Sequence, residues 1–378
     1  MIEVKLISTS DLSRRRANPI QVMKMAAAFA GLGHRVDLVV PGWKRPTDSL
    51  PFSLRFGLTN YFRIVFAPQV SLFGKLGNVT FGLGVLGVSR RWPDDAVILT
   101  RSERAAAQLA RARKNVLYES HAFAFSNDTV TRKFRRRVRR LMDMPNVRMI
   151  TISRRLRDLW TETGIAAEKI FVAHDGVDVE AFRRIGAWPK SELRTGLDLP
   201  LGRPIVAYAG SLGADRGIGL IFEAAAVHER PLFLILGGSP EEIREGQARA
   251  SKNVLFAGYV DNSAIPLYLA AADVLVMPYQ KTTVTIDGCS PMKVFEYLAS
   301  GRPIIAPRFA SYFEVLNDFT GVWAYEPDDR AAFLNVVGEA LALPEASRAF
   351  DRYERLSPYS WENRARGILD FHTRAFSK

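Results

Sequence analysis

The chain of 378 residues is longer than one small domain and fits two domains of ordinary size. Its hydrophobic fraction of 48% is that of a globular protein, and its single cysteine, Cys289, excludes an internal disulfide. The formal charge is uneven, because residues 1–170 carry a net charge of +17 and the remainder −4, which together give the +13 of the chain. Such an excess in one half indicates an anionic partner: nucleic acid, a phospholipid surface or a phosphorylated substrate.

The N-terminal run MIEVKLISTS starts directly with a strand-like pattern, so we expect no signal peptide. No uninterrupted apolar stretch reaches the roughly 20 residues that span a bilayer. With one cysteine, which fits a reducing compartment, these features predict a cytoplasmic protein.

Short β-branched runs alternate with helix-length spacers, which is typical of parallel sheets covered on both faces. The first half contains the predicted strands Val4–Ser8, Val36–Val40, Ile64–Ala67, Ala96–Thr100, Asn115–Glu119, Met149–Ser153 and Ile170–Ala173. The second half contains Ile205–Gly210, Leu232–Leu236, Val254–Ala257, Val274–Pro278, Ile304–Ala306 and Val322–Tyr325. The polar stretch Asp178–Arg203 separates the two series.

This pattern predicts an α/β protein with two doubly wound, Rossmann-like domains that face each other across a cleft, where a ligand would meet the carboxyl ends of the strands. We place the domains at residues 1–180 and 181–358. Residues 359–378 have apolar positions at helical spacing after Ser360, which predicts a terminal helix that packs back on the first domain.

Three strand ends of the second half carry glycines that would let a backbone approach a ligand closely. In AYAGSLGADRGIG (207–219), Arg216 sits in a glycine-spaced loop and could bind phosphate oxygens, although a surface arginine in an ordinary turn is the alternative. LGGSPEE (236–242) has Ser239 and Pro240 at a helix start. In FAGYVDNSAIPLYLAAADVLVMPY (256–279), we expect Gly258 and Tyr259 to offer backbone groups to a nucleobase; a simple connection between two elements is the alternative.

The stretch SPMKVFEY (290–297) predicts a helix with Ser290 as its cap, Pro291 in its first turn and Met292 next. A helix start carries partial positive charge and free donors, which suits a pyrophosphate. Lys293 is unfavourable there unless an anion is bound. Glu296, one turn on, could accept ribose hydroxyls; the alternative is a simple Lys293–Glu296 helix pair.

Segments along nearly the whole chain resemble the GT-B glycosyltransferases of family 4. The acceptor side is represented by VMKMAAAFAGLGHRVDLVVP (22–41), LYESH (117–121), TISRRLRDLW (151–160) and HDGVDVEAF (174–182). The nucleotide-sugar side is represented, in order, by AGSLGADRGIG, FAGYVDNSAIPLYLAAADVLVMPY, SPMKVFEYLASGRPIIAP and YSWENRA. The resemblance implies the GT-B fold and hexosyl transfer from a UDP- or GDP-linked sugar, with retention of configuration.

The resemblance also implies roles for single residues. Glu296 matches the second glutamate of the family's Glu-x7-Glu motif and would bind the ribose. Arg216, which matches the basic residue before the loop glycine, and Lys293 would neutralise the diphosphate. His121 matches a histidine that touches the donor hexose; a histidine that is merely hydrogen-bonded after a strand is the alternative.

This sequence departs from the family at three places. The first glutamate of the motif is replaced by Gly288, with Asp287 one residue out of register, which leaves the sugar unidentified. Ser211 stands where the family has an arginine. The arginine-rich loop SDLSRRRANP (10–19) replaces a glycine pair and would contact a diphosphate or an acidic acceptor.

Fixed cations and helix amides stabilise the leaving diphosphate in the transition state without a metal. No Asp-x-Asp pair lies in a suitable loop, so we expect neither a metal nor another cofactor. An inverting enzyme would instead need a general base in the first domain. The candidates for that base are Asp11, Glu103, Glu119 and Asp128.

The run TRKFRRRVRRL (131–141) predicts a basic helix with an apolar stripe of Phe134, Val138 and Leu141. Such a helix can lie on an anionic bilayer, with Phe123, Phe125 and Val79–Val88 adding apolar insertion; a solvated basic helix is the alternative. We therefore expect peripheral attachment to the inner face of the cytoplasmic membrane and a lipid-linked acceptor. The acceptor and membrane residues would be Arg132, Lys133, Arg135, Arg136, Arg137, Arg139 and Arg140.

Two other classes of protein fit parts of the sequence. A nucleic-acid-binding protein would explain the basic half, but it would not explain the phosphate-binding pattern, and no known nucleic-acid motif occurs. A nucleotide-sugar epimerase would share the donor site without needing a basic acceptor domain. We therefore expect no nucleic-acid partner.

Overall fold

The computed structural model describes residues 1–13, 17–45, 47–70, 77–283 and 286–377. The chain forms two compact units. The N-unit comprises Met1–Asp175, Gly288–Ser290 and Trp361–Lys378, and the C-unit comprises Gly176–Asp287 and Pro291–Ser360. The three arginines of the predicted loop at 10–19 lie outside the described residues.

The N-unit is built on an eight-stranded sheet in the order β3-β4-β2-β1-β5-β6-β7-β8. Its strands are parallel except for β3, which pairs antiparallel with β4. The strands are β1 (Glu3–Ile7), β2 (Arg35–Pro41), β3 (Thr47–Asp48), β4 (Arg63–Ala67), β5 (Val97–Thr100), β6 (Val116–Ser120), β7 (Val147–Thr151) and β8 (Ile170–Val172).

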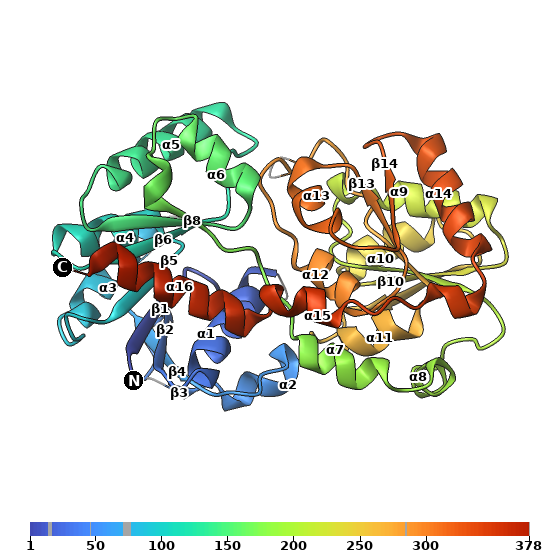
Figure 1. The fold of residues 1–378 in the computed structure, drawn as a ribbon, viewed down its shortest axis with the longest axis horizontal. Coiled ribbons are helices and arrows are strands. Elements are labelled where there is room, and N and C mark those ends of the chain that lie inside the picture. The colour runs from blue at the N-terminus through green and yellow to red at the C-terminus, as the bar shows by residue number, and fades with distance from the viewer. Residues whose placement is uncertain (14–16, 46, 71–76, 284–285, 378) are drawn as a thin grey trace. The chain divides into compact units, whose positions relative to one another are not determined.

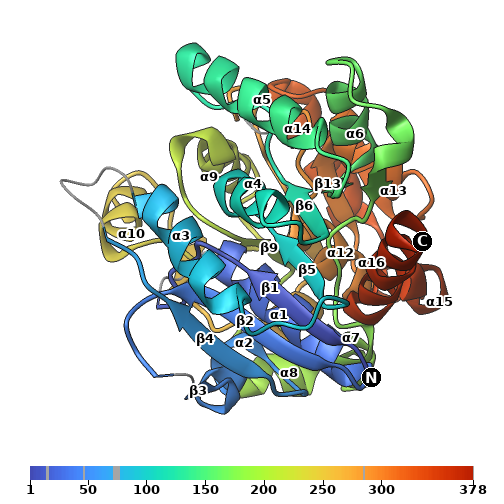
Figure 2. The same ribbon diagram turned by 90° about the vertical axis from the view of Figure 1, so that its left-hand side faces the viewer.

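Helices cover both faces of this sheet. Figure 2 shows α3 and α4 on one face, while α1 and α16 pack against each other in Figure 1. The helices are α1 (Ala17–Gly31), α2 (Ser53–Phe56), α3 (Gly77–Ser89), α4 (Glu103–Arg111), α5 (Asp128–Met142), α6 (Arg154–Thr161) and α16 (Trp361–Phe376), with 3-10 turns η1 (Leu50–Phe52) and η2 (Ala167–Lys169).

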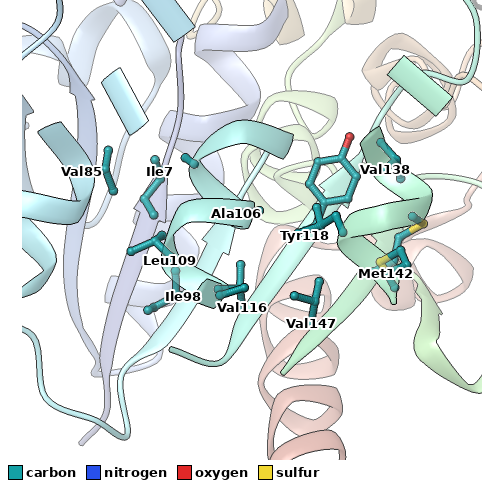
Figure 3. Packing of buried hydrophobic residues seen from close by; sticks show 14 of the residues in the cluster. Ile7, Val85, Ile98, Ala106, Leu109, Val116, Tyr118, Val138, Met142 and Val147 are labelled. Carbon is teal, nitrogen blue, oxygen red and sulfur yellow. The ribbon is translucent and has the colours of Figure 1, made fainter. Parts of the chain in front are cut away.

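Alternate residues of neighbouring strands pack with helix residues into a hydrophobic core in the N-unit. Figure 3 shows Ile7, Ile98, Val116 and Val147 from neighbouring strands packed against helix residues such as Leu109. All of these side chains are essentially inaccessible to solvent. Burial of such side chains, worth about 1.5–3 kcal/mol each, holds the sheet and the helices together.

The C-unit has a six-stranded parallel sheet in the order β11-β10-β9-β12-β13-β14. The strands are β9 (Ile205–Ala209), β10 (Leu232–Leu236), β11 (Val254–Gly258), β12 (Val274–Val276), β13 (Ile304–Pro307) and β14 (Val322–Tyr325). The helices are α7 (Val179–Gly186), α8 (Lys190–Gly196), α9 (Ile218–Val227), α10 (Pro240–Gln247), α11 (Ile265–Ala271), α12 (Met292–Ala299), α13 (Ala310–Leu316), α14 (Arg330–Ala342) and α15 (Tyr353–Leu356), with 3-10 turns η3 (Ala214–Arg216), η4 (Glu345–Arg348) and η5 (Ser357–Tyr359).

The predicted doubly wound α/β fold is confirmed, and every predicted strand has an observed counterpart. The sequence pattern missed β3, because two exposed polar residues give no apolar signal. The stretch Asp178–Arg203, which we read only as a polar separator, contains α7 and α8.

Candidate active site

The C-unit sheet reverses its strand order between β9 and β12, because the chain adds β10 and β11 on one side of β9 and the later strands on the other. Ligands of open α/β sheets bind at the carboxyl ends of the strands beside such a reversal. Gly210 directly follows β9, and Tyr279 lies shortly after β12. These two positions mark the edge of the sheet at which the predicted phosphate-binding residues meet.

Lys293 lies in the first turn of α12 and is buried, with 8% of its surface exposed. Its Nζ atom lies 4.2 Å from the ring centroid of Tyr208 and 4.8 Å from that of Tyr279. This nitrogen has no hydrogen-bond partner among the described residues. Burial and the positive charge of Arg216 lower the pKa of Lys293 to about 7, although Glu296 raises it. A buried cation without a hydrogen-bond partner is costly, so the site suits an anion.

Gly210 makes room for the Lys293 ammonium. A Cβ atom at position 210 would lie 2.5 Å from Lys293 Nζ and 2.8 Å from the Tyr208 hydroxyl oxygen, closer than real contacts allow. The Tyr208 hydroxyl donates to the Ser211 carbonyl at 2.7 Å, which fixes the ring beside this glycine. The glycine at position 210 therefore lets the backbone lie close to the Lys293 side chain of the protein itself.

Arg216 ends the turn η3, and its Cζ atom lies 4.9 Å from the centroid of the Tyr279 ring. Gly217 has a φ of 69°, and a Cβ there would lie 1.7 Å from the Pro278 carbonyl oxygen. Only glycine fits such a left-handed, crowded position. Because Gly217 seats this turn against the end of β12, Arg216 and Lys293 both lie near one tyrosine ring.

The start of α12 differs from our prediction by about one residue. The helix begins at Met292, with Pro291 as its N-cap and no capping side chain, so the prediction of Ser290 as cap is wrong. The reason is that Pro291 has an extended ψ of 128°, which delays entry into the helix. The Ser290 hydroxyl instead accepts a hydrogen bond from the backbone N–H of Asp175 at 3.4 Å.

Glu296 lies one turn beyond Lys293 and is half-buried. Asn262 donates from Nδ2 to Glu296 Oε1 at 3.3 Å. Lys293 Nζ has no hydrogen-bond partner among the described residues, so Glu296 acts on it through its charge and not through a hydrogen bond.

The other predicted donor-binding residues lie around this edge or at the chain segment that precedes α12. Gly258 has a φ of 71°, and its carbonyl accepts from Gly237 N–H at 2.6 Å; Tyr259 beside it is half-buried. Ser211 and Asp287 are exposed. The structure brings Arg216, Lys293 and Gly210 together, and it leaves the expected roles of Tyr259, Ser211 and Asp287 as predictions.

Gly288 occupies the position at which the family has a glutamate, and it packs closely in the N-unit. Its carbonyl accepts from Ser153 Oγ at 2.9 Å, and a Cβ there would lie 3.1 Å from Leu156 Cδ1. A side chain at 288 would therefore press on α6, which gives the departure from the motif a physical reason.

In the N-unit, His121 directly follows β6 and is exposed. Two residues before it, Glu119 is buried and accepts from Arg101 Nε at 2.7 Å and from Arg364 Nη2 at 2.9 Å. Gln21 Nε2 donates to the same carboxylate at 3.2 Å. Although burial raises the pKa of Glu119, the charges of Arg364 and Arg101 lower it to about 2.

That arrangement bears on the general-base candidates for an inverting enzyme. A carboxylate with so low a pKa is a weak base, which argues against Glu119. Glu103 is ion-paired with Arg137 at 2.9 Å. Asp11 accepts hydrogen bonds from Ser13, and Asp128 is an exposed residue at the start of α5.

The predicted basic helix is α5, but its apolar stripe does not face outward. Phe134, Val138 and Leu141 are 7%, 0% and 2% exposed because they pack into the N-unit core, so the expectation that this stripe lies on a bilayer is wrong. Of the basic residues, Arg135 lies over the Phe123 ring at 3.6 Å and Arg137 pairs with Glu103. The exposed ones are Arg132, Lys133, Arg136, Arg139 and Arg140.

The other segments expected to insert into a membrane are also largely used in packing. In α3, a Cβ at Gly82 or Gly84 would lie 2.2 Å from Gln108 or from the Pro68 carbonyl oxygen, so these glycines allow close packing. Phe123 packs on Trp160, while Phe125 is 39% exposed. Among the described residues, every helix is too short or too polar to span a bilayer.

Sequence reasoning missed three residues of the C-unit site: Tyr208, Tyr279 and Asn262. All three lie on or just beyond strands at the carboxyl edge of the sheet. A tyrosine one residue before the end of a buried strand, as in AYAG, is the signal that could have identified Tyr208.

Comparisons with known proteins match each of the two units with a separate family model. The family model "Glycosyltransferase Family 4" matches residues 20–181, and "Glycosyl transferases group 1" matches residues 203–342. The putative colanic acid biosynthesis glycosyl transferase WcaI of Escherichia coli K12 is 26% identical over 211 residues, which are 54% of this chain and 51% of that protein. The chain spans about half the length of the curated relatives it matches.

Solved structures share the fold over the full length. Sucrose-phosphate synthase from Thermosynechococcus elongatus aligns with a TM-score of 0.78 at 18% identity, covering 100% of both chains. The HepE protein of Anabaena, solved in complex with UDP-glucose, aligns with a TM-score of 0.72 at 14% identity over 99% of this chain and 100% of that one. The two family models together match most of the sequence, in the chain order of the two observed sheets. The chain therefore belongs to the GT-B glycosyltransferases, of the family 4-like kind.

Proposed function

We propose that this protein transfers a hexosyl unit from a UDP- or GDP-linked sugar to a lipid-linked saccharide, with retention of configuration, in the synthesis of a cell-surface polysaccharide, lipopolysaccharide or glycolipid. The nucleotide-sugar donor is supported by the UDP-glucose bound in one structural relative. The polysaccharide context is supported by the WcaI relative.

The observation that carries the proposal is the buried Lys293 ammonium, which lacks a hydrogen-bond partner among the described residues and lies near Arg216. Two cations and a helix start at the carboxyl edge of a doubly wound sheet form a site for a diphosphate. Glu296, one turn further along α12, is placed to accept ribose hydroxyls, with Asn262 fixing its carboxylate.

In the proposed reaction the C1–O bond of the donor breaks, and its electron pair leaves with the diphosphate. The acceptor hydroxyl oxygen bonds to C1 from the face of departure, and its proton passes to the departing phosphate oxygen. Arg216 and Lys293 stabilise the negative charge that grows on the leaving group. His121 would contact the hexose. These cations supply the charge that a metal would otherwise provide, so we propose a metal-independent reaction.

We also propose that the acceptor is presented at an anionic membrane surface, on the cytoplasmic face, and that α5 provides the contact. Its five exposed basic side chains support an electrostatic attachment rather than insertion, because the apolar stripe of the helix is buried. Each cation near an anionic surface contributes about 1 kcal/mol.

A thermal-shift panel of UDP, GDP, UDP-glucose and GDP-mannose tests the donor half of this proposal, because a ligand of the native state raises the melting temperature. We expect one nucleotide series to raise it and EDTA to leave that shift unchanged. A Lys293→Met variant should lose the shift. If no nucleotide stabilises the wild-type protein at millimolar concentration, the proposed donor is wrong.

A further inference from the structure

One aromatic ring of the C-unit is within reach of two cations. The Tyr279 centroid lies 4.9 Å from Arg216 Cζ and 4.8 Å from Lys293 Nζ. The face of a tyrosine ring carries partial negative charge and attracts cations, more strongly where water is excluded. Lys293 has a second ring, that of Tyr208, at 4.2 Å.

The Tyr279 ring faces two side chains of like charge, of which Lys293 is buried and Arg216 is partly buried. Arg216 and Lys293 repel each other, and Lys293 Nζ has no hydrogen-bond partner among the described residues. Asp215 lies 3.5 Å from Arg216, and Glu296 lies one turn from Lys293. The charged and titratable groups that face this cluster are Arg216 and Asp215 on η3, Glu296 and Tyr297 on α12, Tyr208 on β9, and Tyr279.

Tyr279 is itself held firmly. Only 8% of its surface is exposed, and its ring packs edge-on against Tyr312 of α13 with centroids 6.0 Å apart. Edge-to-face packing of this kind fixes a ring orientation. A fixed ring between a loop arginine and a helix lysine can hold both cations at defined positions.

We propose that Tyr279 is a positioning residue, whose ring keeps Arg216 and Lys293 together in the charged form that binds the donor diphosphate. The proposal rests on the proposed function of this site, because it assigns a role to a residue that would touch neither the sugar nor the reacting bond. A ring that only filled space would be replaceable by an apolar side chain.

The test measures UDP-glucose and GDP-mannose binding by calorimetry, at several pH values on both sides of neutrality. The diphosphate of either sugar does not titrate in this range, so the pH dependence reports the protein. Burial and Arg216 place the pKa of Lys293 at about 7, so affinity should fall as the pH rises through that region. For Tyr279→Leu, we expect about ten- to thirtyfold weaker binding and a pH midpoint shifted downward, because the charged lysine has lost one of its rings.

Tyr279→Phe keeps the ring and should retain the affinity to within about threefold. Tyr353 provides a matched control, because its ring lies 5.4 Å from Arg183 Cζ in the same unit; Tyr353→Leu should leave nucleotide binding unchanged. Should Tyr279→Leu fail to fold, fluorinated phenylalanines at position 279 keep the shape while weakening the ring face, and affinity should fall with each added fluorine.

The proposal would be overturned if Tyr279→Leu bound the nucleotide sugars with wild-type affinity, or bound them more weakly with an unshifted pH midpoint. It would also be overturned if the affinity did not change with the number of fluorine atoms on the ring. Failure of the wild-type protein to bind either nucleotide sugar would instead contradict the proposed function. The two failures are therefore distinguishable.

Discussion

Arg364 of the last helix donates to Glu119 of β6 at 2.9 Å, and both side chains are 2% exposed. The same guanidinium donates from Nε to the His174 carbonyl at 2.8 Å, so it ties α16 to the ends of two segments of the N-unit. The residues joined in this way are 245 positions apart in the chain. One buried ion pair thus fixes the terminal helix next to the strand end that carries His121.

Removal of the Arg364 side chain should destabilise the N-unit. In Arg364→Met, Glu119 keeps Arg101 but loses its second cation, and we expect about 2–4 kcal/mol less stability at neutral pH. Urea unfolding followed by circular dichroism measures the change. Arg366→Met on the same helix is the matched control, because that side chain is exposed and should change the midpoint little.

Glu119 also predicts how stability depends on acid. Its pKa is lowered to about 2 in the folded protein, so its contribution is present above the ordinary carboxyl pKa and is lost as the pH falls from about 4.5 towards 2. In Glu119→Gln, part of this loss between those pH values should disappear, and the variant should be less stable at neutral pH. If the free energy of unfolding falls equally with decreasing pH in the wild-type protein and in Glu119→Gln, the prediction is contradicted.

The buried charge of Lys293 is expected to lower the stability of the free protein, although the proposed donor site needs it. Its folded pKa of about 7 lies below the ordinary value of 10.5, so the unfolded chain binds the proton more tightly and the folded state loses stability as the pH falls from 10.5 towards 7. Lys293→Met should therefore increase the free energy of unfolding of the free protein at neutral pH by about 1–3 kcal/mol, which raises its melting temperature. Exposed Lys252→Met is the control, and an unchanged or lower melting temperature for Lys293→Met would show that the site is not strained.

The pattern of apolar runs was enough to predict the fold, because most strands of the two sheets are buried along their length and leave a local signal. The details at strand ends and helix starts were not predictable in this way. Ser290 looks like a cap in sequence, yet its hydroxyl is taken by Asp175, which lies 115 residues earlier. Likewise, the stripe of Phe134, Val138 and Leu141 fits a membrane-facing helix equally well as a core-facing one, and only the sheet beside it decides.

The charges of the site were easier to find than their surroundings. Lys293 stood out because a cation is unfavourable at a helix start, and Arg216 because an arginine in a glycine-spaced loop can bind phosphate oxygens. Tyr279 gave no signal, because an aromatic residue after a buried strand is ordinary core. Its role follows from two distances between chain segments that are far apart in sequence.

Gly210→Ala should impair donor binding while the fold is retained. The added methyl would meet the Lys293 ammonium at 2.5 Å, so the lysine must move away from the position beside Tyr208. We expect about tenfold or greater weakening of nucleotide binding, measured by calorimetry, with the far-ultraviolet spectrum unchanged. Gly196→Ala is the control, because nothing lies within 4 Å of a Cβ there. Equal nucleotide affinity in both variants would mean that the exact position of Lys293 is unimportant.

The exposed face of α5 predicts salt-dependent membrane binding. Because the apolar stripe of this helix is buried, its attachment should depend on charge alone and weaken steeply as ionic strength rises. Sedimentation with vesicles of neutral lipid, with and without anionic phosphatidylserine, measures this. Replacing Arg136, Arg139 and Arg140 by Gln should weaken binding to anionic vesicles more than about tenfold.

Replacing Arg183, Arg184 and Arg230, three exposed arginines of the C-unit, by Gln removes the same charge and should have a much smaller effect. If both triple variants lose binding equally, net charge and not α5 directs the protein to the membrane, and equal binding to neutral and anionic vesicles would reject the electrostatic attachment.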